Sequence, residues 1–184
     1  MNLSTIFILG ILAVAVAYIW SIYNSLATGK VRIKEALSGI DVQLKRSVDL
    51  IPNLIETVKG YEKHEKEVFE DVTKARASLM KADSVGDKAE SNNMLSGALK
   101  SLFAIAEAYP TLKANENFKE LQEELSDTEN KIAYSRQFYN SNVRDYNTTL
   151  ANFPSSFIGK MFGFKSEEFF EASEGEKKPI KVKF

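Results

Sequence analysis

The residues that could perform chemistry in this chain are few. There is one histidine, His64, and no cysteine, and neither a Gly-x-Ser-x-Gly elbow nor a glycine-rich phosphate loop occurs. A di-iron site in a helical bundle uses two Glu-x-x-His motifs, but Tyr61 stands three residues before the single histidine. His64 to Val68 is likewise not a His-Glu-x-x-His zinc motif. We therefore expect no catalytic residue, no cofactor and no such metal site, and we predict that the chain is not an enzyme.

Two weaker chemical hypotheses remain. Glu123, Glu124 and Asp127 could bind a cation through carboxylates alone, but a solvated acidic helix face is the commoner arrangement. His64 could sense a pH of about 6.5, whereas a histidine on a helix surface, satisfied by a neighbour, is the simpler interpretation.

A row of polar residues within an otherwise apolar helical pattern is the one local oddity. Between 118 and 149, positions spaced three and four residues apart mark one face of a helix. The second half of this face contains Tyr139, Asn142 and Tyr146. If the segment around 31–51 lies alongside, these side chains would face Arg46 or Asp49. This candidate polar seam is interpreted either as a network that sets helix register or as a groove for a small molecule or peptide.

The elements that must position these residues are helices. Apolar residues recur every three or four positions in 31–51, until Pro52 is expected to end or kink the helix. A second helical run covers 54–79. A third opens with Asp87 and Glu90 as a capping box and closes at Pro110. A fourth begins at about Asn115. Such helices can hide their apolar faces only against each other, so we predict an all-α, up-and-down antiparallel four-helix bundle.

The first 29 residues contain no charged side chain. Residues 3–23 form an apolar run that would be about 31 Å long as a helix, enough for a hydrocarbon core of roughly 30 Å. Tyr18, Trp20 and Tyr23 stand where an interface would be. A cleaved signal peptide is the alternative, with Ala13 and Ala15 at suitable spacing, but no basic residue precedes the run and the run is long. We favour a retained transmembrane helix.

The charges that follow this run predict its orientation. Lys30, Arg32 and Lys34 are opposed only by Glu35. By the positive-inside rule the N-terminus lies outside and the bundle in the cytoplasm, so the sequence predicts a single-pass protein of the cell membrane.

The end of the chain has a different composition. Phenylalanines dominate from Phe153 onward and lysines dominate the last eight residues. Either the aromatic segment folds back as a cap over the bundle, or it lies at the lipid surface with the lysines on anionic lipid. The candidate membrane or partner contacts are Phe157, Met161 and Phe162. Disorder is expected after Glu171 in either case.

These observations divide the chain into three parts: an N-terminal segment with the transmembrane helix (1–29), the bundle (30–152) and a partly disordered C-terminal extension (153–184).

Three blocks of sequence resemble one protein family. The stretches 40–65, 107–147 and 153–164 (IDVQLKRSVDLIPNLIETVKGYEKHE, EAYPTLKANENFKELQEELSDTENKIAYSRQFYNSNVRDYN and FPSSFIGKMFGF) are similar to the LemA family of bacterial membrane proteins. The resemblance implies a four-helix bundle on a single-span anchor with a short extracytoplasmic N-terminus. It carries over no catalytic residue, cofactor or substrate. The chain departs from the family pattern at Ser47, where a second basic residue is common.

The function expected from the sequence is that of a membrane-anchored, non-enzymatic scaffold or interaction module of the bacterial cell envelope. Its expected partners are the lipid bilayer and other membrane or envelope proteins, with room for a homo-oligomer. The near-zero net charge of -1 argues against nucleic acid. The alternative is a ligand-sensing or signalling domain that uses the polar seam.

Overall fold

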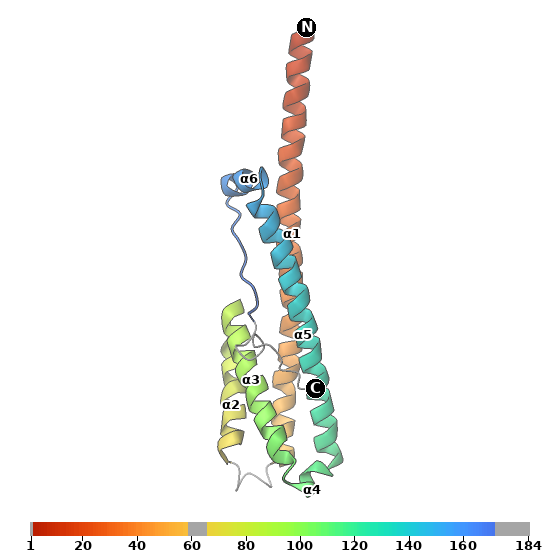
Figure 1. Cartoon of the computed structure of the whole chain (residues 1–184), viewed down its shortest axis with the longest axis vertical. Coiled ribbons are helices and arrows are strands. Elements are labelled where there is room, and N and C mark those ends of the chain that lie inside the picture. Colours follow the sequence, from red (N-terminus) through yellow and green to blue (C-terminus); the bar gives the residue numbers. More distant parts are fainter. Residues whose placement is uncertain (1, 59–65, 172–184) are drawn as a thin grey trace, which may run out of the picture.

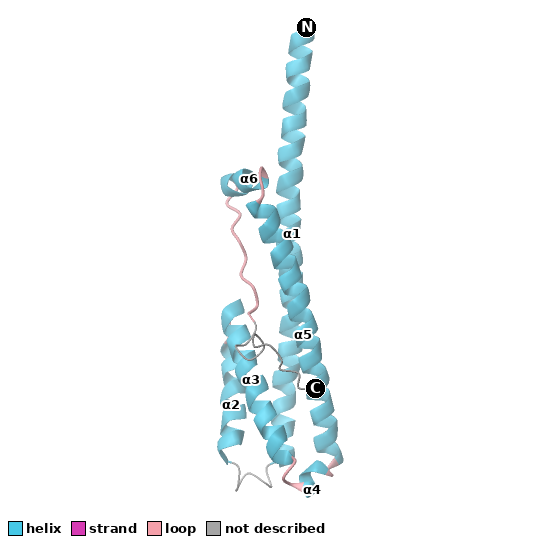
Figure 2. Ribbon diagram, viewed as in Figure 1, coloured by secondary structure: helices cyan, strands magenta, loops and turns pink. Residues whose placement is uncertain are grey.

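The structure, a computed structural model, describes residues 2–58 and 66–171. These residues form six helices and no strand, which confirms the all-α prediction (Figures 1 and 2). The helices are α1 (Leu3–Val58), α2 (Lys66–Lys81), α3 (Val85–Ala106), α4 (Pro110–Lys113), α5 (Glu116–Ala151) and α6 (Ser155–Met161).

Helix α1 changes its surroundings along its length. Residues 2–21 are exposed on every side, and they project beyond the rest of the protein in Figure 1. From Ile22 onward the apolar residues spaced three or four apart become buried: Ile22, Leu26, Ile33, Ala36, Ile40, Leu44, Val48, Ile51, Leu54 and Val58. We call this second part of α1, together with α2, α3 and α5, the helical body.

Helices α1 and α5 pack against each other over most of the length of α5, in opposite directions (Figure 1). Near the end of the body where the exposed part of α1 emerges, a Cβ atom on Gly29 would lie 2.9 Å from Cδ2 of Tyr146. Toward the other end, Nη2 of Arg46 is 3.5 Å from Oε1 of Glu124. These two contacts fix the register of the pair.

Helices α2 and α3 form a second packed pair, and α2 joins it to α1. The turn between them is capped by Ser84, whose Oγ accepts from the Asp87 N–H at 3.0 Å while Oδ2 of Asp87 accepts from the Ser84 N–H. The predicted capping box of Asp87 with Glu90 was therefore placed three residues too late. Lys88 ties α3 to α1 through an ion pair of 2.7 Å with Asp41.

Helix α1 does not end at Pro52, which corrects one of the two outcomes that the sequence predicted there. Proline has no N–H for the carbonyl four residues earlier, which here belongs to Val48. The guanidinium Nε of Arg76, on α2, donates to that carbonyl at 3.0 Å. A long-range donor thus satisfies the carbonyl that proline leaves open, and the helix continues to Val58.

The remaining boundaries follow local signals. Helix α3 ends at Ala106, and Pro110 begins the short α4 rather than closing α3. The predicted start near Asn115 is confirmed, because the Oδ1 of Asn115 caps α5 by accepting from the Phe118 N–H at 3.1 Å. Helix α5 returns to the level where α1 leaves the body, and there α6 lies across its end (Figure 2).

The substitution Arg76→Met tests how α1 passes Pro52. We expect it to lower the free energy of unfolding by about 1 to 3 kcal/mol, because the Val48 carbonyl loses its donor. In a Pro52→Ala background the alanine N–H can donate instead, so the loss should be clearly smaller. Denaturation of the full chain in detergent, followed by circular dichroism, measures this double-mutant cycle. Equal losses in both backgrounds would contradict the assignment.

Candidate functional site

Two tyrosines of the predicted polar seam bind the backbone of the C-terminal segment. Residues 164–171, which we call the strap, run from α6 back along α5 without helical structure. The hydroxyl of Tyr139 donates to the Glu168 carbonyl at 2.9 Å, and the hydroxyl of Tyr146 donates to the Lys165 carbonyl at 2.9 Å. Both phenol rings are buried.

Two asparagines hold the same segment more completely, because each binds both backbone groups of one strap residue. Asn140 donates Nδ2 to the Phe170 carbonyl at 3.0 Å and accepts the Phe170 N–H on Oδ1 at 2.8 Å. Asn147 binds Glu167 in the same way, at 2.9 and 3.0 Å. An asparagine amide thus replaces the neighbouring strand that an extended backbone would otherwise need.

The spacing of these residues matches the geometry of the two elements. Seven residues separate Asn140 from Asn147, a rise of about 10.5 Å on a helix. The strap residues that they bind are three apart, a rise of about 10 Å in extended chain. The two rises are nearly equal, so both asparagines can bind the strap at once. The two tyrosines are also seven residues apart, and the strap residues that they bind are also three apart.

Side chains fix the ends of the strap. Phe170 is 1% exposed, and the guanidinium carbon of Arg136 lies 5.1 Å from the centre of its ring. Arg136 also donates Nη2 to the Glu171 carbonyl at 3.0 Å. Nearer α6, Lys30 on α1 pairs with Glu167 at 3.1 Å. The strap therefore joins α1 to α5.

The surroundings keep both phenols protonated. Burial raises the pKa of Tyr139, and the nearby carboxylates of Glu167 and Glu168 raise it further. Burial also raises the pKa of Tyr146, although Lys30 acts in the opposite direction. The hydrogen bond to Glu167 raises the pKa of Lys30. At neutral pH the two hydroxyls therefore remain donors to the strap.

The five residues of the predicted seam are not brought together. Arg46 pairs with Glu124, and Asp49 pairs within α1 with Lys45 at 2.8 Å. Tyr139 and Tyr146 bind the strap, whereas Asn142 donates Nδ2 to the Phe138 carbonyl of its own helix. The register places Arg46 beside Glu124. Glu124 lies 15 residues before Tyr139 on α5, about 22 Å along the helix axis.

A groove of about 390 Å³ does lie beside Asn142 and Tyr146. Its other wall is α1, where Ser25 and Gly29 are among the lining residues. Asn142 and Tyr146 thus line a space that could hold a ligand.

Sequence reasoning missed the two residues that bind the strap most fully, Asn140 and Asn147. A signal was present: the dipeptide Tyr-Asn occurs at 139–140 and again at 146–147. Because the two copies are seven residues apart, they lie on the same face of one helix and can bind one partner at two points. The repeat does not identify that partner.

Two of the three acidic residues of the cation hypothesis are paired with basic side chains. Glu124 pairs with Arg46, and Asp127 pairs with Lys131, whose hydrogen bond lowers the pKa of Asp127. Among residues 2–58 and 66–171, no three histidine, aspartate or glutamate side chains lie close enough to share a metal ion. His64 lies outside the described residues.

The sequence pattern of the LemA family matches residues 36–184, which include α5, α6 and the strap. The chain belongs to the LemA family. This confirms the resemblance that three sequence blocks indicated.

Similar proteins of low identity include magnetosome proteins and a protein named LemA. The magnetosome protein MamQ of Magnetospirillum gryphiswaldense is 25% identical over 184 residues, which cover 86% of this chain and 68% of the relative. A MamQ of Paramagnetospirillum magneticum is 24% identical with the same coverage. Protein LemA of Metamycoplasma hominis is 25% identical over 158 residues, which cover 84% of this chain and 71% of the relative. These names state no molecular activity.

The role of the asparagines can be tested by Asn140→Ala and Asn147→Ala. Each substitution removes two hydrogen bonds to the strap, so we expect each to lower the free energy of unfolding by about 1 to 3 kcal/mol. Amide hydrogen exchange should also lose protection at Phe170 in the first variant and at Glu167 in the second.

Asn142→Ala is the matched control on the same helix, because its amide bonds only within α5. It should change stability by no more than about 0.5 kcal/mol. Unchanged exchange at Glu167 and Phe170 in the test variants would show that the strap is held by its side chains alone.

Proposed function

We propose that this LemA-family chain is a single-span membrane protein whose helical body serves as a non-enzymatic scaffold for other envelope proteins. One observation carries the proposal: α1 joins an exposed apolar segment and the core of the body in one unbroken helix of 56 residues. A partner bound to such a body is held at a set distance and orientation from the bilayer.

The membrane anchor is supported by both composition and exposure. Among the described residues α1 is the one helix long and apolar enough to cross a membrane. Only 6% of its most apolar window is buried within the protein, so this apolar surface is not used by the protein's own core. Lipid is the solvent that would cover it.

For the body we propose the up-and-down four-helix bundle that the sequence predicted. Successive long helices α1, α2, α3 and α5 run in alternating directions along one long axis (Figure 1). The apolar faces of all four contribute to one cluster of buried residues. This is the arrangement expected when amphipathic helices are joined by short connections.

The proposed orientation places the N-terminus outside and the body in the cytoplasm. It rests on Lys30, Arg32 and Lys34, which follow the apolar segment directly and are opposed only by Glu35.

Two features of the body suit a protein partner. Tyr134 and Phe138 are one turn apart on α5, and they are 74% and 55% exposed. Aromatic side chains of this kind are enriched in protein interfaces. On another face of the body, a groove of about 510 Å³ lies between α3 and α5, with Leu99, Phe103 and Ile132 among its lining residues.

The ligand-sensing alternative would use the groove beside Asn142. We favour the scaffold because the hydroxyls of Tyr139 and Tyr146, the most promising ligand contacts of the seam, already bind the strap.

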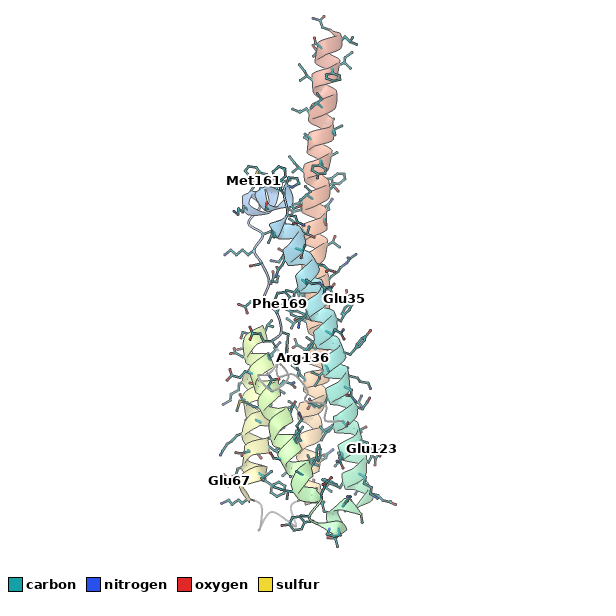
Figure 3. All side chains as sticks on the ribbon, viewed as in Figure 1. Glu35, Glu67, Glu123, Arg136, Met161 and Phe169 are labelled. Atoms are coloured by element: carbon teal, nitrogen blue, oxygen red, sulfur yellow. The ribbon has the colours of Figure 1, made fainter. Side chains whose placement is uncertain are left out.

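Photo-crosslinking in intact cells tests the scaffold. A photoreactive amino acid at Tyr134 or Phe138 of the full chain should yield the same discrete crosslinked protein, identified by mass spectrometry. Glu123, exposed on the same face of α5 three turns earlier (Figure 3), is the matched control and should not yield it. Equal labelling from all three positions would argue against a defined partner at this surface.

Thiol labelling tests the orientation separately. Because the chain has no cysteine, Asn2→Cys and Glu123→Cys each introduce one thiol. With an impermeant maleimide on whole cells, Asn2→Cys should react at once, whereas Glu123→Cys should react only after permeabilisation. The opposite result would place the body outside the cytoplasm.

A further inference from the structure

Helix α6 has one face that packs onto the body. Ile158 and Gly159 are buried. A Cβ atom on Gly159 would meet Leu150 of α5 and would lie 3.6 Å from Cδ1 of Leu26 on α1. This inner face closes the end of the α1 and α5 pair, so the cap interpretation holds for Ile158 and Gly159 but not for the exposed Phe153 and Phe157.

The opposite face of α6 is apolar and exposed. Phe157 and Met161 are four residues apart on one side of the helix, and they are 69% and 57% exposed. Phe153, just before the helix, is 88% exposed. Phe162 beside them is 49% exposed. Four large apolar side chains gathered at one end of the protein form a patch that a water-facing surface rarely carries.

Contacts with α1 determine where this patch lies along the axis of α1. The ring of Tyr23 lies edge-on to Phe162, with ring centres 5.1 Å apart, and to Phe164 at 5.5 Å. Tyr23 is the last residue of the apolar run 3–23. Figure 3 shows Met161 beside α1 at the level where that helix leaves the body. The patch therefore lies where the apolar surface of α1 ends.

We propose that the exposed face of α6, with Phe157 and Met161, and the flanking Phe153 and Phe162 insert into the interface of the bilayer that α1 spans. The inference rests on the proposed membrane anchor. If 3–23 crosses the hydrocarbon core, Tyr23 lies at the headgroup level, and the Tyr23 ring contacts bring α6 to the same level.

The long axis of α6 supports lipid as the occupant. It lies across the direction of α1 (Figure 1), so a membrane-crossing α1 leaves α6 along the membrane surface, as interfacial helices lie. Exposed Lys160 and Lys165 flank the apolar residues, and cations at this depth are attracted by anionic headgroups. The apolar surface of α6 thereby continues that of α1.

The strap then has a mechanical role in this arrangement. It leaves α6 through Phe164 and is held along α5 by Asn147 and Asn140. Together with the inner face of α6, it fixes the patch to the body, so the body contacts the membrane through α1 and α6 rather than through one helix alone.

Tryptophan quenching by lipid tests the insertion. Trp20 is the single tryptophan, so a Trp20→Phe background allows one new tryptophan at a time in the full chain. Phe157→Trp reports on the patch, and Tyr134→Trp, also on an exposed aromatic side chain, is the matched control on the body. Each variant is reconstituted in phosphatidylcholine and phosphatidylglycerol vesicles with or without acyl-chain bromine.

We expect the Phe157→Trp emission to lose at least half the fraction that native Trp20 loses in brominated vesicles, consistent with a depth of about 5–10 Å. Tyr134→Trp should be unaffected. Quenching of Trp20 without quenching of Phe157→Trp would overturn the inference and leave the anchor intact. Absence of quenching at Trp20 itself would overturn the anchor and, with it, this proposal.

Discussion

The close approach of α1 and α5 beside Gly29 is the constraint on which the α6 end of the body depends. The Tyr146 ring occupies the space that a side chain on Gly29 would need. Its hydroxyl reaches past α1 to the strap at Lys165. Because the ring is enclosed on one side by helix backbone and fixed at its tip, it sets how far apart the two helices stand. The ends of α5, α6 and the strap are all positioned from that separation.

The strap shows how a short segment can be bound with few demands on its own sequence. Tyr139, Asn140, Tyr146 and Asn147 all bind its backbone, so most strap side chains remain free to face solvent. Phe169, labelled in Figure 3, is 46% exposed. The specific requirements are the buried Phe170 and the charge of Glu167. The spacing of the four side chains on α5 determines where the strap binds. The strap itself contributes only the carbonyl and N–H groups of an extended backbone to these contacts.

Local patterns predicted much of this architecture, and long-range contacts explain what they missed. The apolar periodicity, the Asn115 cap and the apolar run 3–23 depend on neighbours in sequence, and each was found where it was expected. Pro52 was misread because the donor that compensates for it, Arg76, is 24 positions away in sequence and on another helix. The seam was misread for a similar reason. The residue types indicated buried hydrogen bonding, but the partner was the extended backbone of 164–171, whose composition carries no sign of that contact.

If the apolar segment of α1 crosses a bilayer as proposed, the unbroken helix couples the body to the thickness of the surrounding lipid. A hydrophobic segment that is longer than the local hydrocarbon core tilts to stay within it. The part of α1 after Tyr23 is 35 residues long, about 52 Å as a helix. A tilt of about 10° would therefore carry the α4 end sideways by about 9 Å. Membranes of different thickness would present the far end of the same protein at different positions, without any change within its core.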